Sequence, residues 1–192
     1  MNARVLTLAC AIAAACTAPA VLAQDAPAAR ADAPAAGARA DLTAADRDFV
    51  MKATRSNKTE IAASELALDS AQSDEVRQFA QKMLTDHRKL GEDMKKVAGP
   101  PPAVEADTRV LAPLRELEGD AFDTTFADSM VEEHEKAVAL FQKTAGDDAH
   151  SQGIRDLARK ALPTLQQHER HAKDLAGSEP SQAHRTEPTR TN

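Results

Sequence analysis

The sequence predicts an all-α protein: a four-helix bundle with a long connection between its second and third helices, which itself contains a short helix. Two observations predict this fold. Apolar residues recur at alternating steps of three and four along four separate segments, which is the period of an amphipathic α-helix. In addition, the connection over residues 99–120 is far longer than a turn between neighbouring helices requires.

The first 23 residues have the pattern of a secretory signal peptide. Arg4 precedes an apolar run that is too short to span a bilayer stably, and the small residues Val21 and Ala23 suit signal peptidase. We therefore expect export, with a mature chain that begins at Gln24. A lipid anchor on Cys16 is the alternative, although the three alanines before it form a weak lipobox without Leu.

The composition of the mature chain excludes several classes of function. Both cysteines, Cys10 and Cys16, lie in the segment expected to be removed, so no disulfide or thiol chemistry remains. The net charge is −6, and the loss of Arg4 makes the mature form one unit more negative, which excludes a nucleic-acid partner. No later run is long and apolar enough for a transmembrane helix. The absence of Trp and Tyr counts against radical relays and aromatic stacking surfaces.

The two ends are expected to lie outside the folded domain. Residues 24–41 form an Ala/Pro-rich linker and residues 177–192 a polar tail, and neither has the apolar periodicity that a packed segment needs. The domain is therefore expected over residues 42–176. The five Phe all fall inside it, which predicts a single aromatic core: Phe49, Phe79, Phe122, Phe126 and Phe141.

The first helix is expected from Ala44 to about Ala71, because Thr43 followed by Asp46 resembles a capping box. Its predicted inner stripe is Phe49, Val50, Ala53, Asn57, Glu60, Ser64, Ala67 and Ala71. Its predicted outward residues are Lys52, Arg55, Thr59, Glu65 and Asp69. The second helix should begin after Ser73 and end at Gly99, before three prolines. Its seam is Val76, Phe79, Met83, His87, Leu90, Met94 and Val97.

The long connection predicts a short helix from Thr108 to Glu118, ended by Gly119. Its length can carry the chain along the whole bundle, as in ferritin-like folds, although a simple up-and-down return also fits. The third helix is expected from Asp120 to Ala145. The fourth carries apolar residues from Ile154 to Leu175, and Pro163 should interrupt it with a kink.

Each long helix places one strongly polar residue on its buried seam: Glu60, His87, His134 and His168. Glu60 lies thirteen residues before the turn near Ser73 and His87 fourteen after it, so a rise of about 1.5 Å per residue puts them at nearly equal height. His134 also reaches the middle of the bundle. His168 lies roughly 20 residues past its turn, which predicts a height about 10 Å from the others unless the kink compensates.

Three histidines and a glutamate in a water-poor interior are ligand types for a divalent transition metal such as Zn, Fe, Mn or Cu. Asp86 and Glu133 flank two of the histidines and could accept hydrogen bonds from ligands. A buried Glu–His network that only fixes helix register fits the same spacings. The Glu-x-x-His pairs of di-iron carboxylate bundles are absent at all three histidines, which disfavours oxygen-activating di-iron chemistry. His150 and His171 are expected outside the cluster.

An ordered set of short stretches resembles a known family: Glu60-Ile61, Phe79-Ala80-Gln81-Lys82-Met83, Asp86-His87, Phe122-Asp123, His134, Ala137-Val138, Leu162-Pro163-Thr164-Leu165 and His168. The family is the bacterial domain of unknown function 4142, whose members are often labelled predicted outer membrane proteins. The resemblance covers residues 42–176. It implies a signal-bearing, ferritin-like four-helix domain of the cell envelope with no established activity.

The leading expectation is an exported protein, periplasmic or associated with the outer membrane, that binds a divalent metal or small ligand in its core. One alternative is a structural or interaction module whose buried polar residues only specify packing. A metal-dependent redox or hydrolytic enzyme is a third and weaker alternative. The sequence identifies no catalytic residue, substrate, protein partner or oligomeric state.

Overall fold

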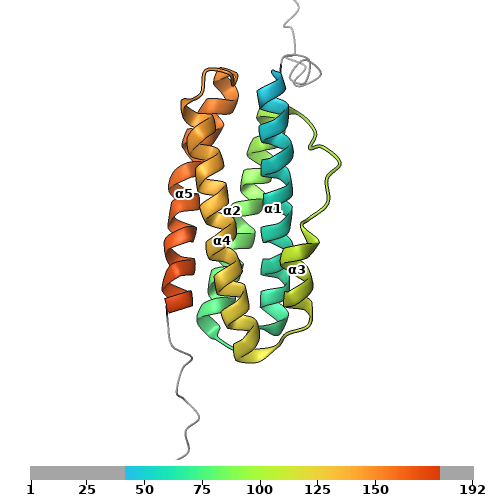
Figure 1. Cartoon of the computed structure of the whole chain (residues 1–192), viewed down its shortest axis with the longest axis vertical. Helices are drawn as coiled ribbons and strands as arrows, with labels where there is room; N and C mark the ends of the chain where they lie inside the picture. The colour runs from blue at the N-terminus through green and yellow to red at the C-terminus, as the bar shows by residue number, and fades with distance from the viewer. Residues whose placement is uncertain (1–41, 178–192) are drawn as a thin grey trace, which may run out of the picture. The chain divides into compact units, whose positions relative to one another are not determined.

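The computed structural model describes residues 42–177, and this part of the chain is all-helical, without a strand. The helices are α1 (Ala44–Ser70), α2 (Asp74–Ala98), α3 (Thr108–Arg115), α4 (Gly119–Gly146) and α5 (Gln152–Gly177) (Figure 1). The predicted fold class is thus confirmed at the level of an all-α fold. The predicted signal peptide (1–23), linker (24–41) and nearly all of the predicted tail (177–192) lie outside the described residues.

Local side-chain chemistry sets the helix ends close to their predicted positions. The Thr43 hydroxyl accepts from the Asp46 N–H at 3.0 Å, and the Asp46 carboxylate accepts from the Thr43 N–H at 3.0 Å, so the predicted capping box is present. Ser73 caps α2 by accepting from the Glu75 N–H. α2 stops before Gly99, whose φ of 79° lies in the left-handed region that favours glycine.

The four long helices pack in a ring, because α1 and α5 each pack against both α2 and α4, while α3 packs against α1 and α4. Asp123, near the start of α4, accepts from the N–H groups of Gln72 and Ser73 in the turn that follows α1. At the other end, the Thr43 hydroxyl donates to the Ala149 carbonyl in the turn after α4. α1 and α4 therefore run antiparallel.

The connection between α2 and α4 runs back along the long helices, as the crossed alternative required (Figure 1). Lys58 donates to the Val104 carbonyl at 2.8 Å, and the Asp107 N–H donates to the Thr59 hydroxyl at 2.8 Å. These bonds hold the connection against the middle of α1. The prediction that Thr59 faces outward is wrong, since the connection covers it and leaves it 0% exposed.

The core consists of two apolar clusters, so the prediction of a single aromatic core is wrong. Phe79, Phe122 and Phe126 belong to one cluster, and Phe49 and Phe141 to the other. Between the two clusters, every long helix carries buried polar residues: Asn57 and Glu60, His87, His134 and His168. A polar layer therefore separates the two clusters.

α5 also differs from its prediction, because it continues through Pro163 without interruption.

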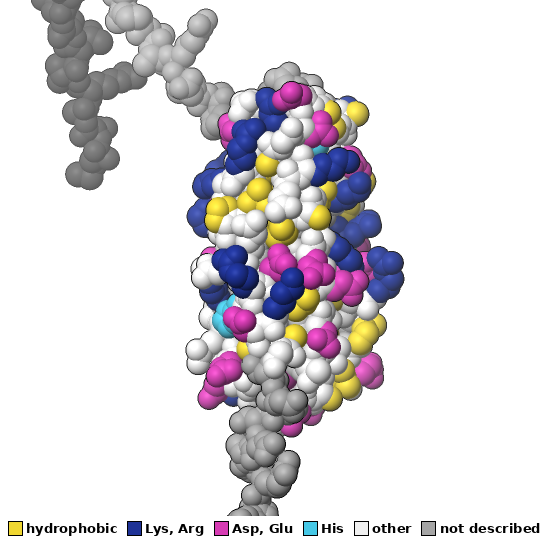
Figure 2. Space-filling model, turned by 60° about the vertical axis from the view of Figure 1, so that its left-hand side comes forward, with side chains coloured by type: hydrophobic (Ala, Val, Ile, Leu, Met, Phe, Trp, Pro, Cys, Tyr) yellow, Lys and Arg dark blue, Asp and Glu magenta, His cyan; other side chains and the backbone are white. Residues whose placement is uncertain are grey.

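None of the helices in residues 42–177 combines the length and the apolar character that crossing a membrane requires. On the face drawn in Figure 2, acidic and basic side chains are interspersed, with small groups of hydrophobic atoms between them.

Candidate metal centre

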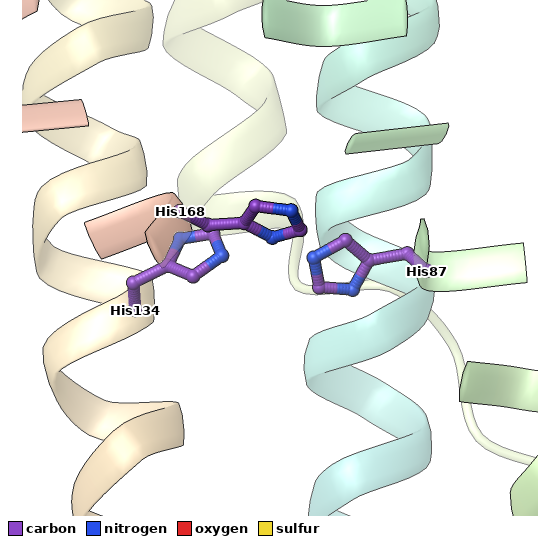
Figure 3. A group of neighbouring side chains, drawn as sticks. All are labelled: His87, His134 and His168. Atoms are coloured by element: carbon purple, nitrogen blue, oxygen red, sulfur yellow. The ribbon is translucent and has the colours of Figure 1, made fainter. Parts of the chain in front are cut away.

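Three histidines from three helices meet in the polar layer. His87 on α2, His134 on α4 and His168 on α5 have ring centroids 5.6, 5.3 and 5.4 Å apart, and each side chain is at most 2% exposed. Figure 3 shows that one nitrogen of each ring points into the space between the three rings. The structure thus brings together all three histidines that the sequence singled out.

The expected offset of His168 by about 10 Å is wrong, for two reasons. α5 begins at Gln152 and not at the turn near Asp147, so His168 lies closer to its helix start than the count assumed. Side chains also lean toward the N-terminus of their helix. Because α4 runs toward the α4–α5 turn and α5 runs away from it, the side chains of His134 and His168 lean toward each other.

The outer nitrogen of each ring has an oxygen partner. His87 Nδ1 lies 3.1 Å from Asn57 Oδ1 and 3.0 Å from Glu60 Oε2. His134 Nδ1 lies 2.8 Å from the Met130 carbonyl, and His168 Nε2 lies 2.8 Å from Asp86 Oδ2. Carbonyl and carboxylate oxygens only accept, so these ring nitrogens carry the hydrogen. In a neutral imidazole, the other nitrogen then carries no hydrogen and presents a lone pair.

Those other nitrogens, His87 Nε2, His134 Nε2 and His168 Nδ1, are buried and have no hydrogen-bond partner in the described part of the chain. A buried polar atom without a partner costs on the order of 1–3 kcal/mol and calls for an explanation. Three such atoms facing one space form a set of nitrogen atoms suited to bind a metal ion. A ligating histidine whose second nitrogen donates to an oxygen is the usual arrangement at protein metal sites.

The ionisation states fit a cation site. Burial lowers the pKa of His168 to about 4, helped by the nearby His87, and burial also lowers the pKa of His134. Both imidazoles are therefore neutral at pH 7 and free to bind a metal. Burial raises the pKa of Glu60, but His87, His134 and a hydrogen bond from Ser56 outweigh it and hold the pKa below its usual range. Glu60 is thus a buried carboxylate.

The three acidic residues predicted near the site, Glu60, Asp86 and Glu133, have different partners. Glu60 on α1 uses Oε2 for His87 Nδ1 and Oε1 for the Ser56 hydroxyl at 2.8 Å, while His134 Nε2 is 4.0 Å from Oε2. Asp86 contacts His168 across the α2–α5 interface and not its sequence neighbour His87. Glu133 pairs with Lys136 on its own helix at 3.0 Å, and no contact between it and the three rings is found.

Sequence reasoning missed some partners and placed others correctly. The sequence predicts Asn57 on the inner stripe of α1 but does not place it at the site. Its spacing of three residues from Glu60 on that stripe is the signal that could have indicated this role. His150 lies outside the cluster as expected, 3.1 Å from Asp46. His171 also lies outside it, packed against Phe79 with ring centroids 4.6 Å apart.

The site is slightly wider than a metal-bound one. One nitrogen from each histidine can be chosen so that all three lie within 4.8 Å of one another. Three nitrogens bound to one zinc at about 2.1 Å in tetrahedral geometry lie about 3.4 Å from one another. Binding therefore requires the ring nitrogens to move inward by up to roughly 0.8 Å each. A cavity of about 200 Å³ between α2 and α5 is lined by His87 and His168.

The fold and the site define an all-α domain whose two apolar clusters are separated by a layer of histidine and acidic side chains. The chain belongs to the family of domain of unknown function 4142 (DUF4142), whose model matches residues 31–175. The resemblance seen in the sequence is thereby confirmed. No curated protein matches the chain.

The fold is similar to a crystal structure of a DUF305 fragment from Deinococcus radiodurans, with a TM-score of 0.62. The match covers 71% of this chain and 97% of that one at 18% identity. At this identity the likeness shows a shared helical fold.

Proposed function

We propose that the protein binds one divalent transition metal ion through His87 Nε2, His134 Nε2 and His168 Nδ1. The observation that carries the proposal is the set of three buried nitrogens without hydrogen-bond partners, one from each of three helices. A metal ion would satisfy all three at once. The same three residues were predicted from the sequence.

The proposed architecture is a ferritin-like four-helix bundle. The ring of four long helices, the crossed connection between α2 and α4, and the likeness to the DUF305 fragment support it. In this architecture, residues that face the bundle axis from different helices form one site. In this chain, the residues that form such a site lie in the polar layer.

Three imidazole nitrogens favour zinc, copper or iron over manganese, which prefers oxygen ligands. Glu60, expected from the sequence as a fourth ligand, has both oxygens in hydrogen bonds to His87 and Ser56. From that position it orients His87 and adds negative charge near the ion. A direct bond from Glu60 to the metal would require Oε2 to leave His87. Asp86 orients His168 in the same way.

Metal titration of untagged protein tests this function. After dialysis against a chelator, the protein should bind one equivalent of Zn²⁺, and His134→Ala should abolish stoichiometric binding. His171→Ala is the matched control, because it removes an imidazole that packs on Phe79 outside the three-ring cluster. Equal losses in the two variants, or no binding by the unaltered protein, would contradict the proposal.

A register-fixing network is the second candidate. The fully buried hydrogen bonds from His87 to Glu60 and Asn57 favour it, because such pairs specify helix alignment without a ligand. It predicts that chelator leaves the melting temperature unchanged. A metal-dependent enzyme is a weaker third candidate, favoured by the 200 Å³ cavity beside His87 and His168, which has room for water and a small substrate.

We propose an exported, cell-envelope location, periplasmic or outer-membrane-associated, on the basis of the sequence pattern in residues 1–23. Intact mass of the protein recovered from the envelope should show an N-terminus at Gln24. A diacylated mass that begins at Cys16 would establish the lipoprotein alternative, and a full-length cytoplasmic product would contradict export.

A further inference from the structure

A second cavity, of about 480 Å³, lies between α1, α2 and the start of the connection. Its volume falls in the range of small-molecule binding sites, roughly 300–1,000 Å³. None of its lining residues lines the smaller cavity beside His87 and His168. It is therefore a separate place in the molecule.

Gly91 creates part of this space. It lies inside α2, where glycine is less favourable than alanine. A Cβ at this position would lie 3.3 Å from Asn57 Nδ2. Because glycine has no side chain, the NH₂ group of Asn57, a hydrogen-bond donor, faces the cavity. The side-chain oxygen of Asn57 accepts from His87 Nδ1.

Thr54 supplies a second polar group. Its side chain lines the cavity and is 4% exposed, yet its hydroxyl has no hydrogen-bond partner in residues 42–177. A helical threonine can usually donate to the carbonyl four residues earlier, as Thr59 does to Arg55. The unpaired hydroxyl of Thr54 is buried at a cost, and a polar group of a bound ligand would satisfy it.

The charges at the rim favour an anion. The rim carries three cations, Lys58, Arg88 and Lys95, and one acid, Glu92. The Lys58 ammonium donates to the Val104 carbonyl, and the Arg88 guanidinium pairs with Glu65 at 3.1 Å. The ammonium of Lys95 makes no hydrogen bond or ion pair within the described residues. This local excess of positive charge stands out in a chain whose net charge is −6.

The polar groups lie at one level of the cavity. Thr54 is nineteen residues before Ser73 and Lys95 twenty-two after it. Since α1 and α2 are antiparallel across this turn, the two residues differ in height by only about 5 Å at 1.5 Å per residue. Apolar side chains, Val50, Ile61 and Met94, form the rest of the wall.

We infer that this cavity binds a small amphipathic monocarboxylate. The Lys95 ammonium and the Thr54 hydroxyl bind the carboxylate, and the apolar body packs against Val50, Ile61 and Met94. This site does not depend on the proposed metal, since its residues are distinct from the three histidines.

Octanoate is a suitable probe, because its eight carbons match an apolar wall and it carries one carboxylate. Titration into the ¹⁵N-labelled protein, followed by ¹H–¹⁵N correlation spectra, should give saturable shifts at the amides of Thr54, Gly91 and Lys95. Octylamine, which has the same chain length and the opposite charge, should bind more weakly. Shifts confined to other residues, or equal binding of the amine, would overturn the inference.

A pair of neighbouring lysines gives the matched variants. Lys95→Glu and Lys96→Glu change the net charge equally, but Lys96 pairs with Asp93 at 3.3 Å and does not line the cavity. Lys95→Glu should weaken octanoate binding by about fivefold, and Lys96→Glu by less than about twofold. Equal weakening would show a general field effect and would also overturn the inference. Gly91→Leu, which fills the cavity, should remove the saturable shifts.

Discussion

The protonation of single buried histidines should control the stability of the metal-free protein. The folded pKa of His168 is about 4, against 6.5 for an ordinary histidine. Between these values the unfolded chain binds the proton and the folded chain does not, so acid favours unfolding. The stability contribution is complete above about pH 6.5 and is lost as the pH falls toward 4. The shift corresponds to about 3 kcal/mol.

We therefore predict that the melting temperature in chelator falls between pH 7 and pH 5, measured by circular dichroism. His168→Leu should flatten this dependence, because the titrating group is gone. His171→Leu, which alters a histidine outside the cluster, should leave it unchanged. A slope that is the same in all three proteins would show that His168 does not titrate as described.

At this scale the sequence was informative where periodicity applies. The alternating steps of three and four were enough to place Glu60, His87 and His134 on buried seams. The partner of His168 could not be predicted, because Asp86 lies on another helix. The spacing of residues along one helix does not show that α2 and α5 pack side by side. The same holds for the outer contact between Asn57 and His87.

At the scale of a helix, Asp46 ties two ends of the fold together. Its carboxylate accepts from Thr43 N–H in the capping box of α1 and from the N–H of Ser151 at 3.0 Å, and it lies 3.1 Å from His150 Nδ1. The side chain is 0% exposed. One residue thus joins the start of α1 to the turn before α5.

Asp46→Ala should lower the free energy of unfolding by roughly 2–4 kcal/mol, since it removes the carboxylate half of the capping box and leaves the N–H groups of Thr43 and Ser151 without their acceptor. Asp48→Ala is the control, because that exposed carboxylate pairs with Lys52 on its own helix, and its loss should cost less than about 1 kcal/mol. Urea denaturation of both variants measures the difference. Similar losses would show that the contacts of Asp46 contribute little.

Helix ends were predictable because capping residues act locally. Thr43, Ser73 and Gly99 each lie at a boundary that the sequence indicated. Two element-level predictions failed. Tertiary packing buries Thr59, because the connection covers it. α5 passes through Pro163 as a continuous helix, although proline has no N–H to donate to the preceding turn.

At the scale of the whole molecule, residues 42–177 contain two apolar clusters and the polar layer between them. The all-α class could be predicted because four amphipathic segments have no other way to bury their apolar stripes. The choice between a crossed and an up-and-down chain could not be made, since the long connection permits both. The hydrogen bonds that Lys58 and Thr59 form with that connection hold it along α1, as a crossed chain requires.

A chain of residues 41–177 should melt within a few degrees of a chain of residues 24–192, because the apolar periodicity ends at these limits. About 1 kcal/mol shifts the melting temperature of a domain of this size by only a few degrees. A fall of more than about 10 °C would mean that residues outside these limits pack against the helices.

We propose that three histidine nitrogens share one metal ion. Crystals of the protein loaded with Zn²⁺, measured at the zinc absorption edge, test it directly through the anomalous difference map. We predict one strong peak about 2.1 Å from each of His87 Nε2, His134 Nε2 and His168 Nδ1. A peak bound by other residues, or zinc-saturated crystals with no peak between the three rings, would contradict the account.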